Sequence, residues 1–337
     1  MLKVFYSIVM YDYNEKARGF SMDPMKLSLS TLPEIQLIPF DCSDFGNMQM
    51  RAENNRKLLE LIDREKPDIF QYVAFTDQIS KETLKYIKER TSTTSINWFC
   101  DDVWRFDQFT KEMCWLFDYS ICVEEDALIK YEKIGYKNVI LSQWATNISL
   151  YPKMNLPFKY DVSFVGQPHG FRREIIAKLE QEGIRVATFG YGWRETPFKR
   201  RWNKRYAKYP FLQFNKGRIS HDEMIRIFNQ SKINLNLSAS SHESAMDQMK
   251  ARNFEVPSCG GFLLTGKVPH LENFFDIGKE VAVYTSIEEM IEKIRYYLAH
   301  EEERQRIANA GYLRTLRDHT YENRFRDIYG RIKLKNR

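Results

Sequence analysis

The sequence predicts an α/β protein made of two successive halves, each with a parallel sheet that helices cover on both faces. Apolar runs rich in Val, Ile, Phe and Tyr alternate with stretches of helical periodicity along the chain, which is the pattern of βα units. The alternation lapses between Gln143 and Lys159, a polar segment that contains Trp144, Pro152 and Pro157, and then restarts. The length of 337 residues also suits two domains.

The first half alternates short apolar runs with helical stretches. The expected strands are 4–10, 35–40, 68–75, 95–100, 119–123 and 139–141. The expected helices are 48–64, 81–89 and 124–133, the first with Leu58, Leu59 and Ile62 on its apolar face. Ligands of open α/β sheets bind at the carboxyl ends of the strands. Polar residues and glycines that directly follow a strand are therefore the candidate site residues.

The second half repeats the same alternation. The expected strands are 161–165, 184–189, 233–237, 262–264 and 281–284, and the expected helices are 171–182, 221–229, 244–256, 287–299 and 301–316. A last helix starts at Tyr321, because Phe325, Ile328, Tyr329 and Ile332 fall on one helical face. We therefore expect an N-terminal domain over 1–150, a C-terminal domain over 151–318 and a C-terminal helix over 319–337.

The composition argues against several classes of protein. Hydrophobic residues make up 43% of the chain and aromatic residues 14%, which argues against disorder. No apolar stretch approaches the roughly 18 residues of a membrane span. The N-terminal apolar stretch lacks the basic region and the small-residue cleavage site of a signal peptide. We expect a cytoplasmic protein, and the sequence leaves a peripheral association with the membrane open.

Cysteine and histidine usage predicts neither a disulfide framework nor a metal site. The chain has five cysteines, an odd number with no pair at CxxC spacing, and six histidines with no pair at metal-ligand spacing. Reduced thiols fit the cytoplasm. We expect no structural metal and no cofactor.

The net charge of +6 is concentrated in residues 194–208, where seven basic residues stand with one acid. Aromatic residues interleave with the cations, which include Lys199, Arg200, Arg201, Lys204 and Arg205. Such a mixture suits an anionic partner, such as a glycan, another polymer or nucleic acid. A surface helix with a buried aromatic stripe predicts the same spacing, so both interpretations stay open.

Glycines follow two strands of the second half. Gly166 ends one strand, and a helix that carries Arg172 follows it, an arrangement that suits an anion but also describes an ordinary βα turn. Gly190-Tyr191-Gly192 ends the next strand. The run resembles a dinucleotide fingerprint only loosely, because the third glycine is missing, which argues against an oxidoreductase. Tyr191 could stack on a base or a sugar, or simply belong to a tight turn.

A small-residue loop leads into the expected helix 244–256. Free N–H groups around Ser240 and Ser241 suit a phosphate. Lys250 and Arg252 could neutralise a diphosphate, which would make a divalent metal unnecessary. Glu255 could accept hydrogen bonds from a vicinal diol such as ribose. The alternative is an i,i+3 salt bridge between Arg252 and Glu255.

Two carboxylates, Asp101 and Asp102, follow the expected strand 95–100. At a strand end they would face a ligand cleft, where one could act as general base on an acceptor hydroxyl or position a donor sugar. The alternative is an aspartate that caps a helix, with a solvated neighbour.

The run K-x-R-x-F-E-x5-G-F-L-L-T over 250–265, followed by Asn273-Phe274-Phe275 and His319-Thr320-Tyr321, resembles the C-terminal domain of GT-B glycosyltransferases. The resemblance covers roughly 160–325, and the group related to the spore-maturation protein CgeB matches best. It implies two Rossmann-like domains that face each other across a cleft, with a C-terminal helix that returns to the N-terminal domain. It also implies metal-independent transfer of a sugar from a nucleotide-diphosphate sugar, a UDP-sugar by preference, to an acceptor hydroxyl.

The resemblance also implies roles for individual residues. Retaining GT-B families have two acidic residues eight positions apart, and Asp247 and Glu255 have that spacing. Glu255 would then bind the donor ribose and Asp247 would lie near the donor sugar, while Lys250 and Arg252 match the diphosphate clamp. No histidine precedes His169, so a carboxylate, Asp101 or Asp102, would have to serve as the base on the acceptor side.

A function from another class is also open. The basic, aromatic segment 198–209 would serve a nucleic-acid-binding protein without catalytic activity, or a glycosyltransferase whose acceptor is nucleic acid.

Overall fold

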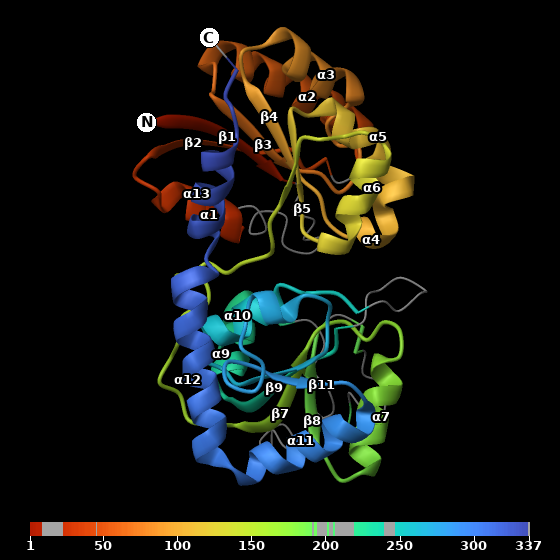
Figure 1. Ribbon diagram of the computed structural model, residues 1–337, viewed down its shortest axis with the longest axis vertical. Helices are drawn as coiled ribbons and strands as arrows, with labels where there is room; N and C mark the ends of the chain where they lie inside the picture. The colour runs from red at the N-terminus through yellow and green to blue at the C-terminus, as the bar shows by residue number, and fades with distance from the viewer. Residues whose placement is uncertain are drawn as a thin grey trace. The chain divides into compact units, whose positions relative to one another are not determined.

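The computed structural model describes residues 1–8, 23–44, 46–190, 192, 193, 201, 205, 219–238 and 247–335. The chain forms two compact units (Figure 1). Unit 1 comprises Met1–Asn147 together with Tyr321–Arg337, and unit 2 comprises Ile148–Thr320. These boundaries lie two or three residues from the expected divisions after 150 and 318.

Unit 1 contains a six-stranded sheet with the order β2-β1-β3-β4-β5-β6. All of its neighbouring strands pair in parallel. The strands are β1 (Leu2–Ile8), β2 (Ile35–Asp41), β3 (Ile69–Val73), β4 (Thr94–Trp98), β5 (Tyr119–Cys122) and β6 (Val139–Leu141). The main helices are α1 (Pro24–Thr31), α2 (Met48–Glu65), α3 (Lys81–Arg90), α6 (Leu128–Lys133) and α13 (Tyr321–Arg331). Each expected strand of the first half is present.

Alternate residues of β1 belong to two cores, because successive side chains of a strand point to opposite faces of the sheet. Phe5 packs in the core that includes residues of α2 and α3. Val4 and Tyr6 pack in the core that α1 and α13 cover. The sheet is therefore covered on both faces, as the sequence predicts.

The C-terminal helix α13 belongs to unit 1, which confirms that it returns to the N-terminal domain. It lies beside α1 (Figure 1). Tyr321 and Phe325 set the edges of their rings against Trp98, with ring centroids 6.2 and 6.1 Å away. All three residues are buried. The aromatic face that the sequence places on this helix thus completes the core beside β4.

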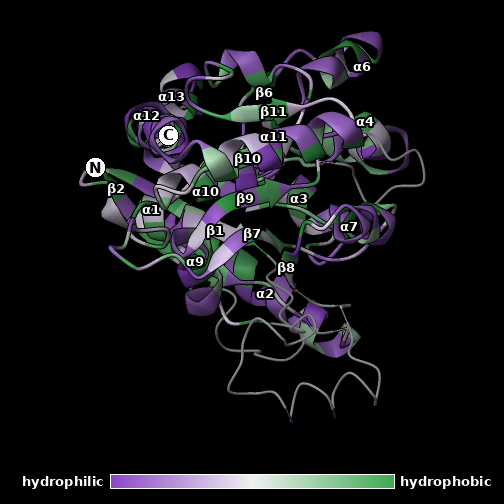
Figure 2. Cartoon of the chain, turned by 90° about the horizontal axis from the view of Figure 1, so that it is seen from below, coloured by the Kyte–Doolittle hydropathy of each residue, from purple (hydrophilic) through white to green (hydrophobic). Residues whose placement is uncertain are grey.

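Unit 2 contains a five-stranded parallel sheet with the order β11-β10-β9-β7-β8. Its strands are β7 (Tyr160–Val165), β8 (Val186–Phe189), β9 (Ser231–Asn236), β10 (Leu263–Gly266) and β11 (Ala282–Tyr284). Its described helices are α7 (Arg172–Gln181), α9 (His221–Asn229), α10 (Arg252–Ser258), α11 (Ile287–Ala299) and α12 (Glu301–Asp318). Hydrophilic colour runs along much of α7 (Figure 2), while its Ile176 and Leu179 are buried in the core.

The strand order of unit 2 reverses between β7 and β9. From β7 the chain runs to β8 on one side, and β9 then pairs with β7 on the other side. This is the topological switch point, where open α/β sheets leave a crevice beyond the carboxyl ends of the strands. The segments that follow β7, β8 and β9 are therefore the part of unit 2 to search for a site.

The expected helix 244–256 is wrong in its bounds. Helix α10 begins at Arg252 and ends at Ser258, with Pro257 inside it. Residues 247–251 are not helical. The Asn253 carboxamide oxygen accepts the N–H of Lys250 at 2.9 Å, so a side chain caps the turn that precedes the helix. Beyond Pro257 the helical pattern continues, because the N–H of Cys259 bonds to the carbonyl of Glu255 at 3.2 Å.

Candidate active site at the switch point of unit 2

Gly166 and Gly190 lie against each other at the carboxyl ends of β7 and β8. Gly190 has a φ of 133°, and a Cβ on it would come within 2.5 Å of the Gly166 carbonyl oxygen. The same oxygen accepts a 2.7 Å hydrogen bond from the indole nitrogen of Trp193. Only glycine fits position 190. Both glycines therefore have a clear structural role, and their proposed contact with a nucleotide stays a prediction.

Arg172 bridges the segments that follow β7 and β9. Its Nη2 donates to the carbonyl of Leu237 at 2.8 Å, and its Nη1 donates to the carbonyl of Gln167 at 2.9 Å. The side chain is buried, and burial lowers its pKa to about 10, so the guanidinium stays charged at neutral pH. Arg172 thus fixes the two sides of the switch point and places a positive charge there.

His169 lies beside Arg172, and reasoning from the sequence missed it. Its Nε2 is 3.0 Å from Nη1 of Arg172. A guanidinium can only donate hydrogen bonds, so Nε2 must accept and the ring proton must be on Nδ1. Burial, with the charges of Arg172 and Lys250, lowers the pKa of His169 to about 4. The imidazole is therefore neutral at physiological pH.

Arg252 and Glu255 form an ion pair in the first turn of α10. The guanidinium also lies 3.4 Å from the carbonyl of Val165 and 5.1 Å from the ring centroid of Phe228. The salt bridge that the sequence left open as an alternative is thus present. It does not decide whether the pair also binds a ligand, because a carboxylate has about four acceptor positions.

Glu255 is buried, with 7% of its surface exposed, and its other oxygen is also occupied. The hydroxyl of Tyr151 donates to Glu255 Oε1 at 2.7 Å. Tyr151 lies in the segment between β6 and β7, about a hundred positions away in the sequence, and no pattern pointed to it. The expected helix 244–256 would place Glu255 near its C-terminal end, where the helix dipole disfavours a carboxylate. That placement is wrong, because α10 starts only three residues earlier.

Polar contacts fix the segment that precedes α10. Asp247 is exposed, and its Oδ1 accepts a 2.7 Å hydrogen bond from the hydroxyl of Ser238, just beyond β9. The N–H of Gln248 donates to the carbonyl of Ser238 at 3.2 Å. The ammonium of Lys250 donates to the carboxamide of Gln248 at 2.8 Å. Asp247 and Lys250 are thus held at the carboxyl end of β9, near Arg172 and Arg252.

The arrangement at this sheet edge concentrates positive charge. Arg172 bonds to the segments after β7 and β9, Arg252 reaches the end of β7, and Lys250 follows β9. Glu255 pairs with Arg252. Such a cluster can bind an anion of two or more charges, and charge-assisted hydrogen bonds from arginine suit phosphate oxygens.

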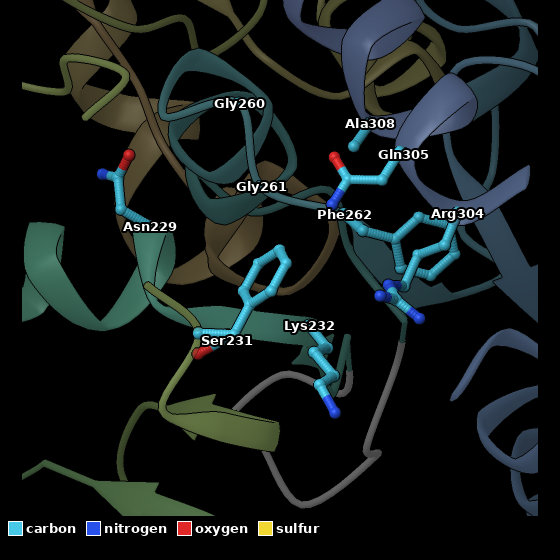
Figure 3. A pocket seen from close by; sticks show the side chains of 10 residues that line it. Asn229, Ser231, Lys232, Gly260, Gly261, Phe262, Arg304, Gln305 and Ala308 are labelled. Atoms are coloured by element: carbon cyan, nitrogen blue, oxygen red, sulfur yellow. The ribbon is translucent and has the colours of Figure 1, made fainter. Parts of the chain in front are cut away.

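A small pocket lies at the opposite end of this sheet, at the start of β9. Its lining residues are Phe158, Asn229, Ser231, Lys232, Gly260, Gly261, Phe262, Arg304, Gln305 and Ala308 (Figure 3). The cavity of about 20 Å³ holds about one water. Lys232 is paired with Asp161 at 2.7 Å. The pocket is too small for a sugar, and none of the predicted site residues lines it.

In unit 1, Asp101 lies three positions after Trp98, the last residue of β4. It adopts a left-handed backbone with a φ of 64°, is partly exposed and makes no side-chain capping bond to the short helix α4 (Asp102–Arg105). Non-glycine residues pay about 1 kcal/mol or more for this conformation. The capping role that the sequence left open is therefore not what holds Asp101 in place.

Asp102 does not face solvent, which corrects its expected role. It is fully buried, and its two oxygens accept 2.6 Å hydrogen bonds from the hydroxyls of Thr110 and Tyr131. Thr110 ends a π-helical turn that follows α4, and Tyr131 lies on α6. Burial raises the pKa of Asp102. The residue ties three segments of unit 1 together and is not placed to reach an acceptor.

Several predicted residues lie outside the described part of the chain, namely Tyr191, Ser240, Ser241, Lys199, Arg200 and Lys204. Of the basic segment, the structure describes Arg201 and Arg205, and both are exposed. The question of a surface helix or an anionic partner at 198–209 stays open.

The residues that the structure describes contain neither a cluster of metal ligands nor a membrane-spanning helix. No three or more His, Cys, Asp or Glu side chains gather there as metal ligands would. No helix in the same residues has the length and apolarity of a membrane span. All five cysteines are buried and free.

Sequence comparisons find relatives of the second half and of most of the chain. A family model described as "Glycosyl transferase-like" matches residues 172–330. The spore protein CgeB of Bacillus subtilis is 23% identical over 272 residues, which cover 77% of this chain and 81% of CgeB.

Solved structures extend the likeness to the whole chain. A glycosyltransferase from Rickettsia africae covers 98% of this chain, over 97% of its own, with a TM-score of 0.64 and 12% identity. Sucrose-phosphate synthase from Thermosynechococcus elongatus covers 98% of each chain, with a TM-score of 0.66 and 9% identity. HepE of Anabaena, solved with UDP and glucose, covers 98% of this chain and 100% of its own, with a TM-score of 0.64 and 12% identity. These likenesses confirm the GT-B fold, and they do not favour the nucleic-acid-binding alternative.

Proposed function

We propose that this chain, a member of the CgeB-like group of GT-B glycosyltransferases, transfers a sugar from a nucleoside-diphosphate sugar to an acceptor hydroxyl without a metal ion. One observation carries the proposal. Lys250, Arg252 and Glu255 lie in or directly before the first turn of α10, at the carboxyl ends of β7 and β9. This is where the strand order of unit 2 reverses, and doubly wound sheets bind nucleotides at that point.

The donor diphosphate would lie against Lys250, with Arg172 and Arg252 behind it. Negative charge develops on the leaving diphosphate in the transition state, and fixed cations at that position lower the barrier without reorganising. The braced guanidinium of Arg172 meets this requirement, because its two donors to backbone carbonyls hold it in place. In this arrangement side chains of the protein supply the charge that a divalent metal would otherwise provide.

Glu255 would accept hydrogen bonds from the ribose hydroxyls. Arg252 and Tyr151 each use one of its oxygens, which leaves acceptor positions free for a diol. We take UDP-sugars as the first donors to test, because HepE of Anabaena was solved with UDP and glucose. Asp247, exposed and held by Ser238, would lie near the donor sugar.

On the acceptor side we propose Asp101 as the general base. Asp102 is fully buried and both its oxygens are occupied, so it is excluded from this role. Asp101 is partly exposed at a strand end and sits in a strained backbone conformation. Strain of this kind clusters at functional sites. We also infer a cytoplasmic site of action, since five free, buried thiols suit a reducing compartment.

A thermal-shift screen against UDP-, GDP-, ADP- and dTDP-sugars tests the proposal, because a ligand that binds only the folded state raises its melting temperature. We expect at least one of these donors to stabilise the protein. Calorimetry on Glu255→Ala should then show weaker binding of the same donor. If no donor stabilises the wild-type protein, the proposed function is wrong. If a donor binds and Glu255→Ala keeps its affinity, only the ribose assignment is wrong.

A further inference from the structure

We propose that Tyr151 is a positioning residue that orients the Glu255 carboxylate for the ribose of the donor. The inference rests on the proposed function. It adds to the site a residue that lies far from α10 in the sequence and that belongs to none of the motifs described above. Its basis is the 2.7 Å hydrogen bond from the Tyr151 hydroxyl to Glu255 Oε1.

The carboxylate of Glu255 needs an external partner to take one orientation. Its backbone is fixed in α10, where its N–H bonds to the carbonyl of Ala251 at 2.9 Å. The terminal torsion of a glutamate side chain is nevertheless broad. Arg252 bonds to one oxygen only, so Arg252 alone leaves the plane of the carboxylate undefined. Tyr151 occupies the second oxygen and thereby fixes that plane.

Tyr151 is itself held firmly. It is 5% exposed, and its backbone carbonyl accepts a 2.9 Å hydrogen bond from the hydroxyl of Ser258, the last residue of α10. Its ring meets the ring of His221, the first residue of α9, with centroids 5.2 Å apart and an interplanar angle of 73°. The hydroxyl is therefore presented to Glu255 by a rigid side chain that is anchored to the same helix.

The oxygen that Tyr151 occupies still has room for a ligand. A carboxylate oxygen has two lone pairs, and a phenol hydroxyl uses one of them. A tyrosine hydroxyl can only donate to an ionised carboxylate, so it fixes where the remaining lone pairs point. With that orientation set before binding, ribose hydroxyls would not have to order the side chain, and preorganisation of this kind improves affinity.

The test compares Tyr151→Phe with the wild-type protein by calorimetry, using matched ribonucleotide and 2′-deoxyribonucleotide pairs: UDP, GDP and ADP with their 2′-deoxy forms. Ordering one side chain on binding costs up to about 1.4 kcal/mol, which corresponds to about tenfold in affinity. We expect Tyr151→Phe to weaken binding of the ribonucleotide about tenfold. We expect binding of the 2′-deoxy form to change much less, so that the preference for ribose shrinks.

Two controls separate positioning from a purely structural role. Tyr136→Phe removes another buried tyrosine hydroxyl with one hydrogen bond, 3.0 Å from Ser120, in unit 1, and should leave the ribose preference unchanged. In a Glu255→Gln background, Tyr151→Phe should alter that preference no further, because the two residues act through one carboxylate.

The results distinguish a failure of the proposed function from a failure of the role given to Tyr151. If no ribonucleotide binds the wild-type protein, the proposed function fails and this inference fails with it. If a ribonucleotide binds and Tyr151→Phe weakens the ribo and 2′-deoxy forms equally, or neither of them, Tyr151 does not position Glu255 while the proposed function stands.

Discussion

Gly190 lies so close to Gly166 that a single added methyl group would reach to 2.5 Å from the Gly166 carbonyl oxygen. The contact joins the ends of two neighbouring parallel strands, β7 and β8, at the edge of the sheet where the cations gather. Trp193 bonds to that same carbonyl. The two glycines therefore set how closely the two strand ends approach, and the segment that carries His169 and Arg172 starts from this contact.

Gly190→Ala should destabilise the protein by about 3 kcal/mol, because a left-handed φ and a clash with backbone add up. Gly183→Ala is the matched control. Gly183 has a φ of 77° with no atom within 4 Å of an added Cβ. An alanine there should therefore lose only the roughly 1 kcal/mol that a left-handed backbone costs a non-glycine residue. Urea unfolding of both variants measures the difference. An equal decrease in the free energy of unfolding for the two variants would contradict the close contact at position 190.

Lys250→Ala should lower kcat/KM for the nucleotide-sugar donor by about 10²-fold, the scale observed when one donor to a developing charge is removed. The fold should survive, since the Lys250 side chain is only partly buried and lies in a segment that is neither helix nor strand. Lys232→Ala serves as control. It removes a cation paired with Asp161 at 2.7 Å near the start of β9. Steady-state kinetics should leave this control near wild type, and an equal loss in both variants would refute the placement of the diphosphate.

Asp101→Asn should reduce turnover by about 10²- to 10⁴-fold, the usual contribution of a general base. Asparagine tolerates the left-handed backbone, so the melting temperature should hardly change. Turnover at saturating donor and acceptor, together with a thermal melt, checks both expectations. Turnover at the wild-type level would remove Asp101 from the mechanism.

Asp102→Ala should lower the stability of the protein and leave its turnover unchanged. It leaves the hydroxyls of Thr110 and Tyr131 without their acceptor in a buried site, which costs about 3 kcal/mol in total. Denaturant unfolding should show this loss, while the turnover of the protein that remains folded should stay near wild type. A stable variant with strongly reduced turnover would reverse the roles assigned to the two aspartates.

His169 should make the protein less stable in acid. Its pKa in the folded state, about 4, is below its ordinary value of 6.5, so the unfolded chain binds more protons between these values. Stability from this residue is therefore complete above pH 6.5 and is lost as the pH falls towards 4. His169→Gln keeps an acceptor near Arg172 but does not titrate. It should therefore remove this residue's contribution to the pH dependence of the free energy of unfolding. NMR titration of the imidazole should show a midpoint near 4, and a midpoint near 6.5 would exclude the neutral ring.

Most of the secondary structure could be predicted because its signals are local. Short apolar runs bounded by turns marked every strand of both sheets, and α2, with Leu58 and Ile62 buried, followed its periodicity. The segment before α10 could not be predicted in this way. Its residues favour a helix by propensity, but contacts from Ser238 and Asn253, on either side of it, hold 247–250 in another conformation.

The candidate site was predictable where its residues lie together in the sequence, as in Lys250, Arg252 and Glu255. It was not predictable where contacts come from distant segments. Asp101 and Asp102 are neighbours in the sequence, yet it is Asp102 that is buried and hydrogen-bonded to Thr110 and Tyr131, which lie on later segments. Tyr151 reaches Glu255 across 104 positions, and no local pattern encodes such a partner.

Because α13 belongs to unit 1, the core of unit 1 cannot be completed before unit 2 has been synthesised. The core around Trp98 lacks Tyr321, Phe325 and Ile328 until these residues have been synthesised. Unit 2, which is continuous from Ile148 to Thr320, has by then been synthesised in full. Domains fold as units during synthesis. Unit 2 can therefore finish folding first, while one apolar face of the sheet in unit 1 stays uncovered until α13 packs on it.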